Sequence, residues 1–404
     1  MNIPVKDALA PSLASGADTK NDVALSLGVP YAPQANKRVV VGMSGGVDSS
    51  VCVLRLQEQG YEVIGVTCLF VDDEASRAAI ADAQSVARVL NVEHHVMDCT
   101  HAFSNNVVQP FIEQYACGLT PSPCVGCNKS CKIPSLVHMA DELGCQYIAT
   151  GHYARVVVCK GRRSIAVSHT MKDQSYMLAL LGQDVLARLL LPLGDMTKDE
   201  VRSIAALAQL PIAHKADSQD ICFIAGSHID FLHDEGVVDA PGNFVTSDGR
   251  VVGQHHGLFQ YTLGQRKGLG IGGAPEPYYV IDKRHDTNEV VVGFAREAFM
   301  DSAVISGVVW QALSLSERTA LCEHTELCER GQALRVQVKL RYRQNAQDCT
   351  AYITDVSEAG DRVVVELDHP IDLTAPGQYG VLYDGDNVMG AGVITSVTHV
   401  HKRN

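Results

Sequence analysis

Short apolar runs and amphipathic segments alternate along the first part of the chain. The apolar runs are rich in β-branched residues, which is typical of buried strands, and they lie at 38–42, 62–68, 92–97 and 146–150. Between them, apolar positions recur at helical spacing, most regularly in Glu74–Leu90 and Ile133–Leu143. This alternation predicts a parallel sheet with helices on both of its faces.

The pattern changes in the second half of the chain. A basic hairpin and two or three helices are expected over 150–209, where Thr197 followed by Glu200 predicts a capped helix start. Residues 240–285 are rich in glycine and carry short β-like runs. Beyond residue 303, short alternating segments predict a small antiparallel β-barrel. These segments are Val304–Trp310, Ala333–Arg341, Cys349–Ser357, Arg362–Leu367 and Val388–Val397.

We therefore predict an α/β fold with the chain divided into four parts. Residues 1–36 form a disordered extension, and 37–216 form a parallel-sheet domain. Residues 217–302 form a small central domain, and 303–404 form the antiparallel β-barrel.

Composition narrows the class of protein only a little. The 404 residues are 46% hydrophobic and 20% charged, which is ordinary for a globular chain. No apolar stretch approaches the ~20 residues of a membrane helix, so we expect no membrane partner. The N-terminal segment lacks the apolar core of a secretory signal, and Asp7, Asp18 and Asp22 are unusual for a transit peptide. We therefore expect a cytoplasmic protein.

The net charge of −13 argues against non-specific binding of nucleic acid but leaves room for a local basic patch. Candidate patches lie at 160–163, 266–267 and 339–343, and each is also compatible with a solvated hairpin face. The thirteen cysteines, without a secretory signal, fit a reducing compartment. Several stand in apolar surroundings typical of buried small hydrophobes, namely Cys52, Cys68, Cys99, Cys145 and Cys159.

Residues 42–50, GMSGGVDSS, carry the clearest chemical signal. They follow a β-branched run and precede a helical pattern, so Gly45 and Gly46 would turn the chain at a helix N-terminus that presents N–H groups to an anion. No lysine follows Gly46, which excludes a Walker A loop, and the spacing is not that of a dinucleotide loop. The order S-G-G-x-D-S resembles the PP-loop of ATP pyrophosphatases, a family that cleaves ATP between the α- and β-phosphates and adenylates a substrate.

Two cysteine segments carry the second signal. Residues 121–132 hold Cys124, Cys127 and Cys131, and residues 217–224 hold Cys222. A zinc half-site is one interpretation, although a second cysteine or histidine pair at finger spacing is missing. A redox C-x-x-C motif normally opens a helix, whereas the prolines here predict a loop. The third interpretation is nucleophilic sulfur chemistry, because lysines adjoin Cys127 and a persulfide on a second cysteine could attack an adenylated carbonyl carbon.

Taken together, these motifs resemble the tRNA-specific 2-thiouridylase family of bacterial type. The resemblance runs from Gly42 nearly to the C-terminus. It rests on GMSGGVDS, TPSPCVGCNK, ATGHYAR (149–155), KDQSYML (172–178), DSQDICFI, HHGLFQYTLGQRKGLGIG (255–272), LRYRQ (340–344) and APGQYGVLY (375–383).

The resemblance implies an ATP- and Mg²⁺-dependent sulfurtransferase. ATP would adenylate O2 of the wobble uridine, a Cys222 persulfide would supply sulfur directly or as hydrosulfide, and Cys127 would act as nucleophile and form a disulfide with Cys222. AMP and pyrophosphate would leave. The positions that match ATP contacts are Gly42, Met43, Ser44, Gly45, Gly46, Val47, Asp48, Ser49, Cys68 and Gly151, with Asp48 and Ser49 near the phosphates and magnesium.

The resemblance also implies partners. The positions that match tRNA contacts are His152, Lys172, Asp173, Gln174, Arg341, Tyr342 and Gln378. The substrates would be wobble-uridine tRNAs, with lysine, glutamate and glutamine acceptors expected, and a cysteine desulfurase or relay protein would deliver sulfur. One departure concerns Cys124, which stands where several family members have an acidic residue, so the general base is not identified. Cys131 is interpreted as a spare thiol.

Two other hypotheses remain open from the residues alone. Another PP-loop enzyme, a ligase or amidotransferase synthetase, would use the same loop but would not need Cys127 and Cys222. A non-enzymatic RNA-binding protein stabilised by zinc would use the cysteines but not the loop.

Overall fold

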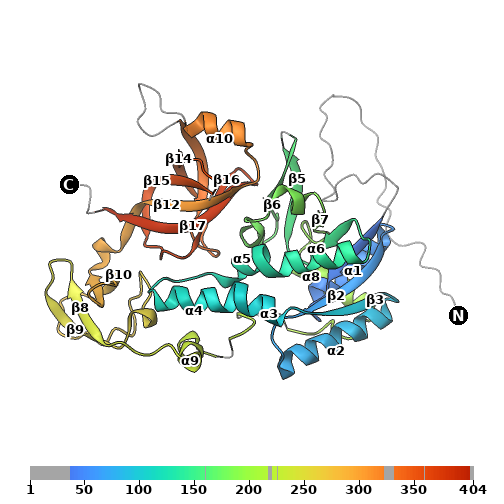
Figure 1. The fold of residues 1–404 in the computed structure, drawn as a ribbon, viewed down its shortest axis with the longest axis horizontal. Coiled ribbons are helices and arrows are strands. Elements are labelled where there is room, and N and C mark those ends of the chain that lie inside the picture. Colours follow the sequence, from blue (N-terminus) through green and yellow to red (C-terminus); the bar gives the residue numbers. More distant parts are fainter. Residues whose placement is uncertain are drawn as a thin grey trace.

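The computed structural model describes residues 37–159, 161–216, 221–224, 226–322, 332–358 and 360–400. The predicted disordered extension over 1–36 lies outside the described residues. Within the described ranges the strands form three sheets, one parallel, one mixed and one antiparallel (Figure 1). The division of the chain at residues 216 and 302 stays a prediction.

The parallel sheet confirms the strand–helix alternation. Its order is β3-β2-β1-β4-β7, and every neighbouring pair is parallel. Its strands are β1 (Arg38–Gly42), β2 (Glu62–Leu69), β3 (Glu93–Asp98), β4 (Tyr147–Ala149) and β7 (Leu189–Leu190). Because successive side chains in a strand point to opposite faces, Val39 and Val41 pack into one hydrophobic cluster and Val40 into another.

Helices cover both faces of this sheet. The face of Val39 is covered by α1 (Val47–Glu58), α2 (Glu74–Val89) and α8 (Lys198–Leu207), and the face of Val40 by α6 (Ile133–Glu142). The helix start predicted at Thr197 is confirmed, because Thr197 and Glu200 form a capping box. The helices therefore shield both faces of the sheet from solvent. A ligand would bind at the strand ends, where the connecting loops lie.

The connection from β3 to β4 is a long helical segment. It contains α3 (Thr100–Phe103), a π-helix (Ser104–Val108), α4 (Gln109–Ala116), α5 (Pro123–Cys127) and a second π-helix (Asn128–Lys132) before α6. In Figure 1, α4 and α5 run beneath the C-terminal barrel, and α4 reaches from the parallel sheet toward the central part of the chain.

The central part contains α9 (His228–Asp234) and a four-stranded sheet in the order β10-β11-β8-β9. Its strands are β8 (Gly242–Thr246), β9 (Val251–His255), β10 (Tyr279–Arg284) and β11 (Glu289–Gly293), with short 3₁₀ turns at Leu258–Gln260 and Ala295–Glu297. Lys283 of β10 donates a hydrogen bond to the Gly118 carbonyl oxygen at 2.7 Å, which joins this part to the end of α4.

The C-terminal part is a closed antiparallel barrel of six strands, as predicted. The order is β12-β15-β14-β13-β16-β17, and pairing of β12 with β17 closes the barrel. The strands are β12 (Phe299–Trp310), β13 (Ala333–Lys339), β14 (Gln347–Asp355), β15 (Asp361–Asp372), β16 (Tyr379–Asp384) and β17 (Asn387–His399), and α10 (Leu315–Cys322) packs outside β14. The sequence pattern did not indicate β16.

The basic hairpin is the join between barrel and parallel-sheet domain. Its strands, β5 (Ala154–Cys159) and β6 (Arg162–Val167), extend the barrel sheet beyond β17. Gln311, which is fully buried, accepts from the Ile165 N–H at 2.8 Å and donates to three carbonyl oxygens of residues 178–181. This segment includes the end of a 3₁₀ turn (Ser175–Leu178) and precedes α7 (Gln183–Leu186). The barrel is thus fixed beside the sheet edge.

Candidate active site

The loop Gly42–Ser49 lies at the carboxyl end of β1, the central strand of the parallel sheet. Hydrogen bonds hold it in shape. The Met43 N–H donates to the Val66 carbonyl oxygen at 2.8 Å, and the Ser44 N–H donates to the Ser49 hydroxyl at 3.2 Å. The N-cap position of α1 is Gly46, which has no side chain to accept from the first-turn N–H groups. An anion placed there would receive these donors.

Two glycines are required by this geometry. Gly45 has φ +67°, in the left-handed region that favours glycine. A Cβ atom on Gly151, which follows β4, would lie 2.8 Å from the Asp48 carbonyl carbon and 2.9 Å from the Ser49 nitrogen. Gly151 therefore lies directly against the start of α1. Of the predicted nucleotide contacts, the structure brings Gly42–Ser49 and Gly151 together.

Asp48 is surrounded by donors and cations. Its Oδ1 accepts from Lys198 Nζ at 2.5 Å and from the Tyr153 hydroxyl at 2.7 Å, and its Oδ2 lies 4.0 Å from Lys172 Nζ. Lys198 comes from α8 and Lys172 from the loop after β6. Positive charge beside the loop thus comes from distant segments that the linear motif does not contain.

The C-x-x-C motif is helical, and the prediction that it sits on a loop was wrong. Cys124 and Cys127 both lie in α5, which begins at Pro123. Proline is favoured in the first turn of a helix, where its missing N–H has no intrahelical partner, so it started the helix here. Cys127 is buried and 6% exposed, whereas Cys124 is exposed.

The surroundings of Cys127 stabilise its thiolate. A hydrogen bond from the Cys131 thiol is the largest cause that lowers the pKa of Cys127, and the Lys132 ammonium and the Lys132 N–H add to it against the opposing effect of burial. The same hydrogen bond raises the pKa of Cys131. Cys131 and Lys132 lie in the π-helix that follows α5, a local widening that is frequent at functional sites. Cys131 is therefore a partner of Cys127 and not the spare thiol expected from the sequence.

A second thiol pair lies at the ends of β2 and β3. The Cys68 thiol donates a hydrogen bond to Cys99, which lowers the pKa of Cys99 and raises that of Cys68. Cys99 also lies 3.5 Å from the Ser135 hydroxyl. Cys52, Cys99 and Cys145 are buried as expected, while Cys68 and Cys159 are partly exposed.

The segment that holds Cys222 packs against the hydrophobic cluster that contains Cys127. Residues 217–220 of its motif lie outside the described part of the chain. Phe223 packs against Phe103 and Phe111 at ring distances of 5.6 and 5.2 Å, in the hydrophobic cluster that also contains Cys127. The Cys222 residue is exposed at the surface, but neighbouring protein desolvates its sulfur and raises the pKa of Cys222 to about 11. The charges of Lys132, Cys127 and Cys124 also act on it. The two cysteine segments, about 95 residues apart in the chain, therefore pack into one hydrophobic cluster through Cys127 and Phe223, and the charge of Lys132 acts on both thiols.

The residues matched to tRNA contacts gather beside this thiol site. Lys339 Nζ lies 3.4 Å from Asp173 Oδ2, and the Tyr342 hydroxyl donates to the Asp173 carbonyl oxygen at 3.3 Å. Gln378 donates to the Thr120 carbonyl oxygen at 2.7 Å, next to the cysteine helix. Arg341 is exposed beside Tyr342. Loops of the barrel thus bring Tyr342 to the loop 172–174 and Gln378 to the segment before α5.

Three of these residues form hydrogen bonds or close polar contacts within the protein, namely Asp173, Gln174 and His152. The Asp173 carboxylate accepts from the N–H groups of Ser168 and Ser175, and Gln174 accepts from the Tyr153 N–H at 2.9 Å. His152 contacts the Thr150 hydroxyl at 2.8 Å, and desolvation lowers its pKa to about 3, so its ring is neutral.

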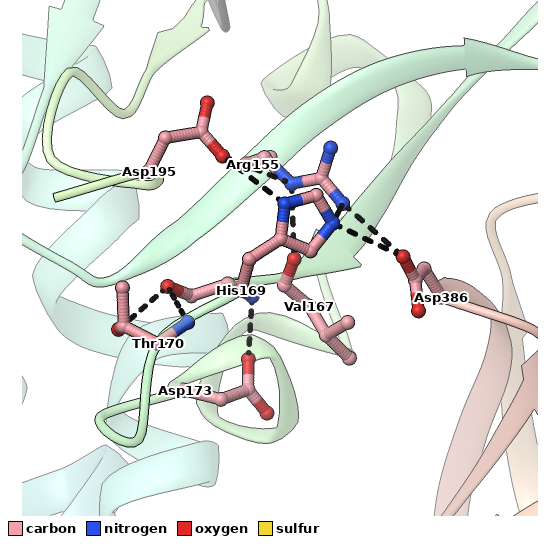
Figure 2. A network of polar contacts seen from close by, with 8 residues as sticks. Arg155, Val167, His169, Thr170, Asp173, Asp195 and Asp386 are labelled. Carbon is pink, nitrogen blue, oxygen red and sulfur yellow. Dashed lines mark hydrogen bonds and ion pairs between the residues drawn. The ribbon is translucent and has the colours of Figure 1, made fainter.

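Figure 2 shows how this loop is anchored on the barrel. Arg155 of β5 lies 2.8 Å from the His169 ring and 3.5 Å from both Asp195 and Asp386. Asp386 belongs to the turn between β16 and β17, so one guanidinium links the hairpin, the loop before α8 and the barrel. This arrangement fixes the loop 168–175 from two sides.

The other basic patches have different surroundings. Arg162 donates to the Gln311 carbonyl oxygen at 3.0 Å, so this part of the hairpin packs on the barrel, while Lys160 lies outside the described residues. Arg266 and Lys267 are exposed in the glycine-rich loop of the central part.

Among the described residues, no group of three or more His, Cys, Asp or Glu side chains is arranged to hold a metal ion. The helices in the described ranges are all too short or too polar to span a membrane.

Fold and site together define the class of the protein. A parallel sheet with an S-G-G-x-D-S loop at the end of its first strand is the architecture of a PP-loop domain, and this class implies the use of ATP. Three family models match the chain: a tRNA methyl transferase HUP domain over 37–226, a tRNA methyl transferase PRC-barrel domain over 229–294, and an aminomethyltransferase beta-barrel domain over 311–394.

Curated relatives identify the family. The tRNA-specific 2-thiouridylase MnmA of Lachnoclostridium phytofermentans is 40% identical over 373 residues, which cover 89% of this chain and 99% of that protein. The protein of the same description from Syntrophotalea carbinolica is 40% identical over 369 residues, with 89% and 99% covered. The chain therefore belongs to the tRNA-specific 2-thiouridylase family, whose members are sulfurtransferases. Membership decides against the ligase and the non-enzymatic zinc protein.

A likeness to solved structures is weak. The U34-tRNA thiolase NcsA from Methanococcus maripaludis, described with its [4Fe-4S] cluster, matches with a TM-score of 0.32 and 17% identity, covering 50% of this chain and 64% of that chain. At this level the match carries no argument about the site.

Proposed function

We propose that this protein is an ATP-dependent tRNA sulfurtransferase that converts the wobble uridine to 2-thiouridine. The observation that carries the proposal is the packing of Phe223, next to Cys222, into the cluster of Cys127 at the carboxyl end of β2, beside the strand that leads into the PP-loop. One site would thus hold an activating nucleotide and the two thiols that sulfur insertion requires. Cytoplasmic tRNAs with lysine, glutamate or glutamine acceptors remain the expected substrates.

The loop supplies the activation step. The first-turn N–H groups of α1 and the ammonium groups of Lys172 and Lys198 would bind the ATP phosphates, and Gly151 allows them to approach closely. Asp48 and Ser49 offer the carboxylate and hydroxyl oxygens that Mg²⁺ prefers, and the ion would neutralise the pyrophosphate as it leaves. The uridine O2 attacks the α-phosphate, and the resulting adenylate makes C2 an electrophile with AMP as its leaving group.

The thiols supply the replacement step. The persulfide on Cys222 adds its outer sulfur to C2 as AMP departs, and the Cys127 thiolate then attacks the Cys222 sulfur and releases the thiouridine. Alternatively, Cys127 attacks first and frees hydrosulfide, which adds to C2. Both routes leave a Cys127–Cys222 disulfide, and both need Cys127 as a thiolate, the form that Cys131 and Lys132 favour.

The surface formed by Lys172, Arg341, Tyr342 and Gln378 would receive the tRNA. Exposed Arg341 suits phosphate contacts, and Tyr342 offers a ring for stacking on an extruded base. Asp173 and Gln174 would act by shaping the loop, because their side chains are engaged within the protein. A sulfur donor protein would have to reach Cys222, which is exposed.

The test is a sulfur-transfer assay with ATP, Mg²⁺, a persulfide donor and unmodified tRNA. We expect 2-thiouridine, AMP and pyrophosphate in equal amounts. The Cys222→Ser variant should release pyrophosphate and stop at the adenylated tRNA, without thiouridine and without a matching amount of AMP. Full thiolation by that variant with the natural donor would contradict the proposal.

A further inference from the structure

Cys124 has no task in the proposed reaction, yet it lies among the reacting thiols. It stands three residues before Cys127 on the first turn of α5, a spacing that places two side chains on one helix face. Cys124, Cys127 and Cys222 interact electrostatically with one another, and Lys132 acts on all three. The positive charge of Lys132 therefore lowers the pKa of all three thiols.

The three thiols differ in exposure. Cys124 and Cys222 are exposed residues, while Cys127 is 6% exposed and packs in the cluster of Phe103 and Cys131. A disulfide between Cys127 and Cys222 would therefore have one sulfur inside this cluster. An external reductant attacks a disulfide sulfur directly, so a half-buried disulfide is reduced slowly.

We propose that Cys124 is the resolving cysteine of this enzyme. After sulfur transfer, the Cys124 thiolate attacks the Cys222 sulfur of the Cys127–Cys222 disulfide. A Cys124–Cys222 bond forms, the Cys127–Cys222 bond breaks, and its electron pair leaves with Cys127 as a thiolate. The exchange changes no overall oxidation state, and the oxidising equivalent is the one that the persulfide supplied. An external dithiol then reduces the exposed Cys124–Cys222 disulfide. This inference rests on the proposed function.

The chemistry of the three thiols favours attack at Cys222. Exchange is faster when the leaving thiol is the more acidic one, and Cys127 is the thiol whose thiolate the protein stabilises. The pKa of Cys222 is raised, so Cys222 is the poorer leaving group. The same difference favours Cys124–Cys222 over Cys127–Cys222 at equilibrium, because the former leaves Cys127 free as its stable anion.

Cys124 also becomes more acidic when its action is needed. Its pKa is raised by burial and by the negative charge of Cys127, and lowered by Lys132. Once Cys127 is in a disulfide it carries no charge, so one of the two opposing effects disappears while Lys132 remains. The pKa of the Cys124 thiol would thus be lower after sulfur transfer than before it.

The test combines one-turnover chemistry with disulfide mapping on the full-length protein. Enzyme loaded with persulfide on Cys222 reacts with ATP and excess tRNA without reductant, and free thiols are then alkylated and the disulfides mapped by mass spectrometry. In the unmodified protein we expect a Cys124–Cys222 disulfide and an alkylated Cys127. In Cys124→Ser we expect the Cys127–Cys222 disulfide.

Kinetics separate a resolving role from a structural one. Cys124→Ser should complete the first turnover with an amplitude within about twofold of the unmodified protein, and lose roughly tenfold in the steady-state rate with a protein dithiol as reductant. Cys117→Ser removes another exposed thiol from the same connection and should change neither. Access of the reductant to the disulfide can be tested separately. A high concentration of a small thiol should restore the steady-state rate of Cys124→Ser.

Three outcomes would overturn this inference. The first is a Cys127–Cys222 disulfide that persists in the unmodified protein, together with an unchanged steady state in Cys124→Ser. The second is loss of the first turnover in Cys124→Ser with native folding by circular dichroism, which would give Cys124 an earlier task. The third is zinc or iron that stays bound by these thiols through turnover. Absence of thiouridine in the unmodified protein would instead contradict the proposed function.

Discussion

The nucleotide loop and the thiol site lie side by side but are built in opposite ways. The loop is one continuous strand–turn–helix, Gly42–Ser49, whose shape depends on backbone hydrogen bonds and on glycine. The thiol site is assembled from α5, the π-helix after it and the segment 221–224, and its chemistry depends on which side chains these segments bring together. A motif can therefore encode the shape of the first, although distant segments supply the cations around Asp48, whereas the second exists only through tertiary packing.

The largest effect is expected from a substitution confined to the thiol site. Cys127→Ser keeps the size of the side chain but removes the thiolate, because a serine hydroxyl does not ionise near neutral pH. We expect thiouridine formation to fall by at least ~10³-fold, while ATP binding, measured calorimetrically, stays unchanged. A substantial residual thiolation rate, or weakened ATP binding, would mean that the two halves of the site are not separable.

The converse change acts on the loop alone. Gly151→Ala would place a Cβ atom 2.8 Å from the backbone of Asp48, and backbone cannot move aside as a side chain can. Overpacking of this kind typically costs about 1–3 kcal/mol, so we expect ATP binding to weaken by roughly 10–100-fold. Calorimetric titration with ATP measures this effect.

The matched control is Gly272→Ala, whose Cβ would meet nothing within 4 Å. It should leave ATP affinity unchanged. The alkylation rate of Cys127 should be the same in both glycine variants. If Gly151→Ala bound ATP normally, the close approach of Gly151 to α1 would have no part in nucleotide binding.

A smaller effect tests how neighbouring groups set the pKa of Cys127. Cys131→Ala removes the thiol that donates to Cys127, so the pKa of Cys127 should rise toward its ordinary value of about 8.5. Hydrogen bonds to charged groups contribute about 1.5–3 kcal/mol, which corresponds to a rise of roughly 1–2 pKa units. In the unmodified protein, alkylation of Cys127 should decline only as pH falls through the lowered pKa.

In Cys131→Ala that decline should begin at a higher pH, with equal rates for both proteins above pH ~10. The pH profile of iodoacetamide alkylation, followed by peptide mass spectrometry, measures the shift. Cys145→Ala is the control, because Cys145 is also buried but packs in a different cluster. An unshifted profile in Cys131→Ala would assign the low pKa of Cys127 to Lys132 alone.

The smallest effect concerns the surface that both halves share. Lys339→Met keeps the apolar stem but removes the ammonium that lies 3.4 Å from Asp173 Oδ2. Because this pair is mostly buried, we expect tRNA affinity, measured by filter binding, to fall by about 3–10-fold through loosening of the loop 168–175. Arg335→Met removes an exposed charge from the same strand and should not change tRNA affinity.

Much of the fold was readable from the sequence because its signals are local. The β-branched runs gave the parallel sheet, and the pair Thr197 and Glu200 gave the start of α8. Tyr379–Asp384 was missed because its neighbours supply the pairing: β13 and β17 flank it, and a segment after Pro376 and Gly377 carries little strand signal of its own. Pro123 was misread as a loop residue, although proline suits the first turn of a helix.

The functional site divides in the same way. The loop could be predicted because its motif is contiguous, while the roles of Cys127 and Cys222 stay predictions that rest on the family resemblance. Lys198 and Tyr153 on Asp48, and Cys131 on Cys127, could not, since each contact depends on packing of distant segments or on a π-helix. The one available signal was the spacing of Cys127 and Cys131, four residues apart, which a helical assignment would have placed on one face.

The most direct test follows a single sulfur atom. Enzyme carrying ³⁵S in a Cys222 persulfide is mixed with ATP and tRNA under single-turnover conditions. We predict that ³⁵S moves to thiouridine in amounts equal to the AMP formed, and that Cys127→Ser releases pyrophosphate but yields no free ³⁵S-thiouridine. Equal release of free ³⁵S-thiouridine by Cys127→Ser, or transfer of ³⁵S without AMP, would contradict this mechanism.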